Sequence, residues 1–177
     1  MSTLKVNNIQ NVSGQPNLGK ILQVVQTYYT TPTSQSISAQ NYTDITGMSA
    51  TITPSSTNSR IIIHARWFGE NSTTWDGGFG LKRNGTIIGA PPSPGSRAAL
   101  MTTGSLSYHL ADDNNSTPET AQLWYVDSPS STSSTTYTMW YSNTNSMTLY
   151  INRTQGDTDS FNLERGTSAI ILMEVGQ

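Results

Sequence analysis

The side chains that most often carry catalysis or hold metals are few in this sequence and lie far apart. The chain has two histidines, His64 and His109, and no cysteine. A zinc site or a nucleophilic triad needs several such groups that converge on one point. His64 lies inside the apolar run IIIHARWF, where we expect a structural or interface histidine. These residue types therefore predict no catalytic residue, no metal and no cofactor.

Acidic residues gather in two loops that resemble calcium-binding loops. One loop is residues 112–115, DDNN, and the other contains Asp157 and Asp159. Calcium takes six or more oxygen ligands, and neither loop has the spacing and distal glutamate of an EF-hand. Solvated loop acids are therefore the favoured interpretation, and a surface-bound ion is the alternative.

Glycoside hydrolysis is the enzyme chemistry that the remaining acids could serve, because it uses two carboxyl groups at a defined separation. Nothing in the spacing of these acids pairs them, and the chain has no G-x-S-x-G elbow, phosphate loop or dinucleotide fingerprint. We therefore expect a protein that is not an enzyme. A glycosidase or lyase is the alternative, and it requires two acids that meet in a cleft. The candidates are Glu70, Asp76, Glu119, Asp127, Glu164 and Glu174.

One of the four tryptophans differs from the others in its surroundings. Trp67, Trp124 and Trp140 fall in expected strands, where we predict core or subunit contacts, whereas Trp75 lies in a polar loop, residues 69–77. An aromatic ring in such a loop can stack on a sugar or dock a protein, and ordinary packing is the alternative. Trp75 is therefore the candidate ligand-binding residue.

The composition is typical of strands that each have one solvated face. Of the 177 residues, 34% are hydrophobic and 11% are charged, and Ser and Thr together number 50. The net charge is -2 and the basic residues are scattered, so we expect no nucleic-acid partner, because phosphate binding needs clustered Lys and Arg. No window has the length of a transmembrane helix, and the N-terminus lacks the apolar core of a signal peptide. We expect no membrane insertion and synthesis in a cytosol.

Short apolar or alternating runs, separated by turns rich in Gly, Pro, Ser and Thr, predict about ten strands and no helix. Asn84 and Gly85 lie between FGLKR and TIIG and predict a type I′ hairpin. Residues 30–40 are expected to be a loop, and the strand at 20–29 is expected to be partly covered on both faces. The pattern predicts an antiparallel sandwich or barrel over residues 20–177. The other expected strands are 42–46, 48–53, 60–68, a pair within 98–108, 121–126, 135–141, 148–152 and 168–175, the last of them central.

Residues 1–19 form a polar arm in front of this domain. Its strong apolar residues before Val12 are Leu4, Val6 and Ile9, too few for a core of their own. We predict that the arm docks on a partner or on a sister subunit, with these three side chains as the anchor.

The chain resembles a family of tailed-phage virion proteins, especially those of cyanophages and other marine phages, which are described as tail-fibre, baseplate-fibre or head-decoration proteins. The resemblance spans almost the whole chain and lies in the order of several short segments rather than in an active-site motif. The segments are MSTLKVNNIQ at the start and residues 19–26, 44–57, 81–86, 127–129, 135–137, 150–153, 165–168 and 172–175.

This resemblance implies a jelly-roll-like β-sandwich, a homotrimer, and attachment to the virion through the arm. The leading hypothesis is a non-enzymatic virion protein, made in the host cytoplasm, that acts as a short tail or baseplate fibre or fibre tip. Its expected partners are other copies of itself and other virion proteins, with a host-surface glycan as a further candidate. The alternatives are a capsid decoration protein that stabilises the shell, and a free carbohydrate-binding module that uses Trp75.

Overall fold

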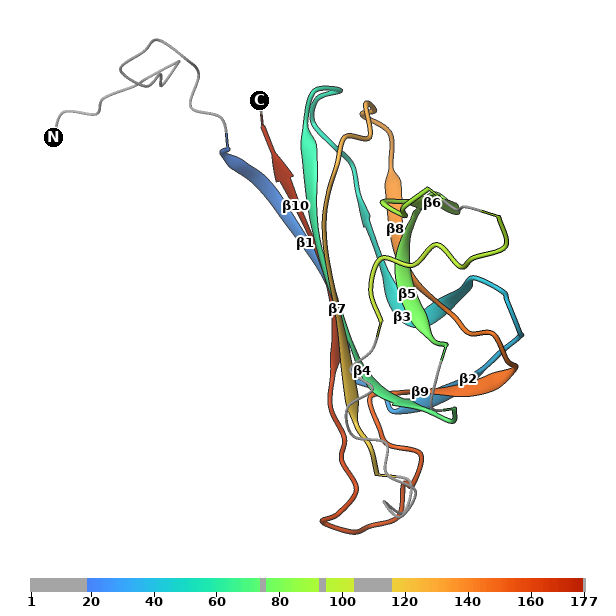
Figure 1. Ribbon diagram of the computed structural model, residues 1–177. Helices are drawn as coiled ribbons and strands as arrows, with labels where there is room; N and C mark the ends of the chain where they lie inside the picture. Colours follow the sequence, from blue (N-terminus) through green and yellow to red (C-terminus); the bar gives the residue numbers. More distant parts are fainter. Residues whose placement is uncertain (1–18, 74–75, 93–94, 104–115, 177) are drawn as a thin grey trace, which may run out of the picture.

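The computed structural model describes residues 19–73, 76–92, 95–103 and 116–176, and within them it is all-β, with ten strands and no helix. Every strand pair is antiparallel, and the strands form two sheets that face each other as a sandwich (Figure 1). This confirms the predicted antiparallel β-sandwich. The strands are β1 (Ile21–Tyr29), β2 (Thr33–Ile37), β3 (Thr43–Ile52), β4 (Arg60–Asn71), β5 (Gly78–Arg83), β6 (Thr86–Ile88), β7 (Glu119–Asp127), β8 (Thr135–Ser142), β9 (Met147–Ile151) and β10 (Ser168–Val175).

The first sheet has the order β1-β10-β4-β9-β2, and β7 pairs with the other edge of β4. The second sheet has the order β3-β8-β5-β6. Strand β4 organises the first sheet, because it pairs with β10, with β7 and, at its C-terminal end, with β9. As predicted, β10 is an internal strand, between β1 and β4.

The core lies between the sheets and is built from alternate residues of each strand. Strand β4 contributes Ile61, Ile63, Ala65 and Trp67, all fully buried. Aromatic rings join the layers, since the Trp67 and Phe79 ring centroids lie 5.0 Å apart. Burial of this apolar surface is the main force that holds the sandwich together.

A partly buried ion pair also ties the two sheets. Asp127, at the end of β7, accepts hydrogen bonds from Arg83 Nη1 at 3.0 and 2.9 Å and from the Tyr137 hydroxyl at 2.6 Å. Arg83 and Tyr137 belong to the second sheet. Burial, together with the Asp127 hydrogen bond, raises the pKa of the Tyr137 hydroxyl. The tyrosine therefore stays protonated and continues to donate to the carboxylate.

The predicted hairpin is confirmed, since β5 and β6 pair across Asn84 and Gly85, whose φ angles are 48° and 82°. Residues 30–40, predicted to be a loop, contain β2, which pairs with β9. That prediction was wrong because β2 is held by backbone pairing and buries only Ile37 fully, so its sequence carries little apolar pattern.

Two further predictions need correction. The two pieces 42–46 and 48–53 form one strand, β3, whose register shifts around Gly47; there φ is +78° and the Tyr29 ring packs too closely for a side chain. The strand pair predicted within 98–108 is absent from its described part, residues 98–103, which make a single bridge between Thr102 and Phe79.

Candidate functional site

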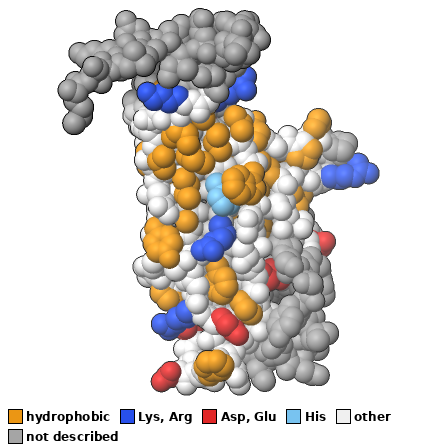
Figure 2. Space-filling model, turned by 90° about the vertical axis from the view of Figure 1, so that its left-hand side faces the viewer, with side chains coloured by type: hydrophobic (Ala, Val, Ile, Leu, Met, Phe, Trp, Pro, Cys, Tyr) orange, Lys and Arg blue, Asp and Glu red, His pale blue; other side chains and the backbone are white. Residues whose placement is uncertain are grey.

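The first sheet turns one face to the second sheet and the other to solvent. We call the solvent-facing surface of β1, β10, β4 and β7 the outer face. Figure 2 shows hydrophobic side chains gathered on it. Sheet faces in contact with water are normally polar, so this concentration of apolar side chains marks the outer face as the candidate functional surface. Its main members are Ile21, Leu22, Val24, Tyr28, Ile62, His64, Trp124, Val126, Ile171 and Met173.

Strand register brings these residues together from four distant segments. Val24 pairs with Met173, Met173 with Ile62, and Ile62 with Val126, so one row of apolar side chains crosses all four strands. Directly paired residues project to the same side of a sheet. In this row Val24 is 58% exposed and Val126 is 52% exposed.

The next row contains the centre of the outer face. Ile171 pairs with His64, and His64 pairs with Trp124. The His64 and Trp124 rings are stacked, with centroids 3.6 Å apart and 14° between their planes, while Trp124 remains 64% exposed. Burial lowers the pKa of His64, and the Arg66 charge lowers it further, against a hydrogen bond with Gln122 that raises it. The histidine is therefore a neutral, packed platform for the tryptophan at neutral pH.

A shallow hollow of about 250 Å³ lies beside this stack, between β1 and β4. Arg66 crosses its rim and donates from Nη2 to the Thr167 carbonyl oxygen and hydroxyl, both at 3.0 Å. The Tyr28 hydroxyl donates to the same Thr167 hydroxyl at 3.2 Å. Arg66 and Tyr28 thus direct these hydrogen bonds to the polypeptide itself. Its lining residues are Gln26, Tyr28, His64, Arg66, Ala169 and Ile171.

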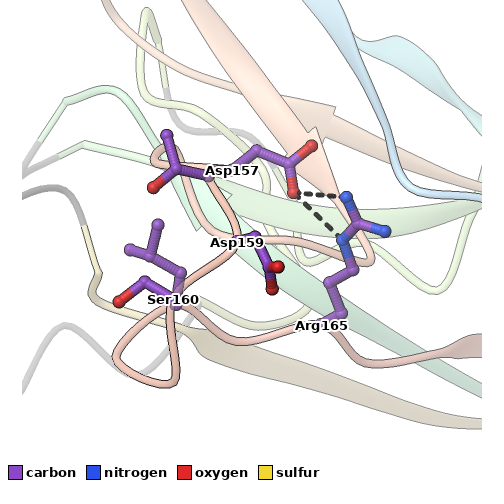
Figure 3. Close-up of a pocket in the computed structure, with 6 residues that line it drawn as sticks. Asp157, Asp159, Ser160 and Arg165 are labelled. Atoms are coloured by element: carbon purple, nitrogen blue, oxygen red, sulfur yellow. Dashed lines mark hydrogen bonds and ion pairs between the residues drawn. The ribbon is translucent and has the colours of Figure 1, made fainter.

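A second feature is the loop of residues 153–167, which follows β9 and precedes β10. Asp157, Asp159, Ser160 and Arg165 surround a polar hollow of about 470 Å³ (Figure 3). Phe161, in the same loop, is fully exposed. A polar hollow and an exposed aromatic ring in one short loop suit a hydroxyl-rich ligand such as a sugar.

The loop is organised around the Asp157 carboxylate. Arg165 donates to Asp157 Oδ1 from Nε at 3.0 Å and from Nη2 at 2.9 Å, and Arg153 Nη1 lies 3.6 Å from Oδ2. Two guanidinium groups therefore already neutralise one of the two acids that resembled a calcium loop. The described parts of the chain contain no group of three or more His, Cys, Asp or Glu that could hold a metal ion.

The acids that could have served hydrolysis are mostly separated. Glu174 accepts hydrogen bonds from the Ser55 amide at 2.7 Å, from the Ser55 and Ser59 hydroxyls at 2.6 Å and from Gln23 Nε2 at 2.6 Å. Burial alone would raise the pKa of this carboxyl, but the hydrogen bonds outweigh it and lower the pKa to about 2. Glu164 accepts from the Ser116 hydroxyl at 2.7 Å.

Glu70 and Glu119 are the two candidate acids that the fold brings within electrostatic influence of each other. Burial raises the pKa of Glu119 to about 7, and the Glu70 charge adds to the effect. Glu70 accepts hydrogen bonds from the Thr117 hydroxyl at 2.9 Å and the Gln155 amide at 2.7 Å. Both carboxyls are buried, so they lie within the fold rather than in an open cleft.

Several residues that the sequence singled out lie outside the described residues: Leu4, Val6, Ile9, Trp75 and His109. Of the other three tryptophans, Trp67 and Trp140 are fully buried, as expected for core residues. Trp124 is exposed, so it is not a core residue. The sequence analysis did not identify the outer face. The runs 121–126 and 168–175 are apolar at most successive positions, which indicates apolar side chains on both faces of those strands and could have located it.

No protein-family model matches this chain, and no curated protein matches it. The described residues also include no helix long and apolar enough to cross a membrane. The outer face and the 153–167 loop are therefore the features from which a function can be argued.

Proposed function

We propose that this chain is a non-enzymatic structural protein of a tailed-phage virion, a short tail or baseplate fibre or a fibre-tip domain. Residues 1–19 anchor it to the particle, and the sandwich projects as a homotrimer toward the host surface. The observation that carries the proposal is that the sandwich has two distinct ends. The described chain enters and leaves the sandwich at one end, and the 153–167 loop lies at the opposite end (Figure 1).

The two ends of the described chain are held together, because the Gly176 amide donates to the Lys20 carbonyl oxygen at 3.0 Å. A tether through residues 1–19 therefore fixes the end of the sandwich at which β1 begins. The 153–167 loop, with its exposed Phe161, then faces away from the particle. This orientation supports a projecting domain whose outer tip makes contact.

The chemistry of the tip supports weak contact with a polar surface, such as a host glycan. Its hollow offers the Asp159 carboxylate and the Ser160 hydroxyl as hydrogen-bonding groups, while Asp157 and Arg165 hold the loop in shape. One such site binds a sugar weakly, but several copies on one particle gain avidity without any new contact. A multicopy virion protein can therefore adsorb strongly through modest single sites.

Two variants of the full chain test the anchor and the tip separately in assembled particles. Replacing Leu4, Val6 and Ile9 by Ser is expected to leave a folded protein that is missing from purified virions, as measured by quantitative mass spectrometry. Phe161→Ser is expected to enter virions normally and to slow adsorption to host cells. Normal incorporation of the triple variant would refute the anchor. Normal adsorption of the Phe161 variant would refute the role of the tip, and a density map with the protein on the capsid would favour shell decoration instead.

A further inference from the structure

The outer face exposes large apolar side chains that are usually buried. Six of them are between 44% and 64% exposed. Strand register places them, with the partly exposed residues between them, on one surface that spans four strands. Contiguous exposed apolar surface of this kind is rare on a monomer and marks interaction sites. The six residues are Ile21, Leu22, Val24, Tyr28, Trp124 and Val126.

The arrangement within the face is also that of an interface. The rows through Ile62 and His64 are mainly apolar and contain the stacked Trp124, whereas the next row brings Arg66 beside Gln122. An apolar centre with a polar rim is the common anatomy of subunit contacts. Tryptophan is among the residue types that most often dominate binding energy, and Trp124 is 64% exposed where it stacks on His64.

The width of the face limits what can cover it. Its apolar row runs across four strands, which is about 15 Å at a strand spacing of 4.7–4.9 Å. One extended segment covers roughly the width of a single strand, so the arm of residues 1–19 is too narrow to cover the face. The arm is also too polar, since its strong apolar residues before Val12 are only Leu4, Val6 and Ile9. A partner that covers the face must itself present a broad apolar surface, and every copy of this chain has one.

We propose that the outer face is the contact between copies of this chain, and that Trp124 and the β1–β10–β4–β7 row lie against a neighbouring copy. The inference rests on the proposed virion function in one respect: a homotrimeric projecting domain would turn these faces toward its axis. The two inner rows of the face, through Ile62 and His64, contain no Lys, Arg, Asp or Glu, and the cations Arg60 and Arg66 lie in the rows on either side. An uncharged centre suits contact with an identical surface, because no like charges are brought together there. Packing of this kind removes apolar surface that would otherwise promote aggregation.

The test is the oligomeric state of the full chain by sedimentation velocity and light scattering across a dilution series. The wild-type protein is expected to self-associate, and Trp124→Lys and Val126→Lys are expected to weaken that association roughly 30-fold or more. Both side chains are more than half exposed, so the variants should fold, which circular dichroism and thermal unfolding will check. The matched control is Ile87→Lys, because Ile87 is 37% exposed but lies on β6 of the second sheet.

Each outcome separates this inference from the proposed function. A monomeric wild-type chain, or equal association of the Trp124 and Ile87 variants, overturns the interface whether or not the chain is found in virions. A trimer or a dimer that the outer-face variants dissociate supports it, and a dimer would correct the subunit number of the proposed function alone. Loss of association after the Leu4, Val6 and Ile9 substitutions, with the outer-face variants unaffected, would assign the contact to the arm and overturn the inference.

Discussion

Glu119 should make the stability of this protein fall as the pH rises from acid to neutral. Its carboxyl is buried near Glu70, and its pKa is raised from the ordinary 4.5 to about 7. In the unfolded chain the group loses its proton near pH 4.5, whereas in the folded protein it keeps the proton until about pH 7. Between these values the folded state binds more protons, so the free energy of unfolding decreases as the pH rises.

The size of the effect follows from the two pKa values. Their difference corresponds to about 3 kcal/mol, since one pKa unit is worth about 1.36 kcal/mol. The stabilising contribution is complete below pH 4.5 and is lost as the pH passes through about 7. A loss of this size is a substantial part of the roughly 5–15 kcal/mol that stabilises a typical protein.

This contribution is measured by urea unfolding of the wild-type protein and of Glu119→Gln. The unfolding curves are recorded at several pH values from about 5 to about 8. Glutamine has nearly the same shape as glutamate and does not titrate, so the difference in unfolding free energy between the two proteins should change by about 2.5 kcal/mol across this range. Other titrating groups, such as His64 and Glu174, cancel in that difference. Glu70→Gln should move the transition of Glu119 to lower pH, because it removes a negative charge. Parallel pH profiles for the wild type and Glu119→Gln would refute the reasoning.

Two further predictions concern the packing of the sandwich. Asp127→Ala should lower the free energy of unfolding by about 3 kcal/mol, because it leaves Arg83 and Tyr137 without their shared partner. The control is Asp44→Ala, which removes a half-exposed ion pair and should lower the free energy of unfolding by less than about 1 kcal/mol. Equal losses in these two variants by chemical denaturation would contradict the inter-sheet role. Gly47→Ala should lower the stability by about 1–3 kcal/mol, since φ is +78° there and an aromatic ring of β1 occupies the space of a β-carbon. An unchanged melting temperature for that variant would show that β3 can relax around the new side chain.

The elements that the sequence predicted well are those in which local chemistry is sufficient. Asn84 and Gly85 tolerate the positive φ angles that a tight hairpin needs, so the turn could be located without knowledge of the rest of the fold. The runs that became β4 and β10 are rich in β-branched and other apolar residues, and their length suits strands rather than helices.

The elements that it predicted poorly depend on distant partners. Strand β2 has a polar sequence and exists because β9 provides backbone hydrogen bonds. The two parts of β3 are one strand because the register shift around Gly47 is absorbed against β8. Local patterns contain no information about such partners, and this is why boundaries and breaks were misplaced.

The sequence by itself determined the class of the fold: an all-β sandwich, poor in reactive side chains and nearly neutral in charge. Only the tertiary structure decided which residues share a surface. Val24, Ile62, Val126 and Met173 form one row, and Glu119 comes under the influence of the Glu70 charge, because strand order and register juxtapose segments far apart in the chain. Alternation along one strand shows that it has an apolar face and a polar face. The order and register of the strands in the sheet decide which residues of neighbouring strands share a face, and whether that face meets the other sheet or water.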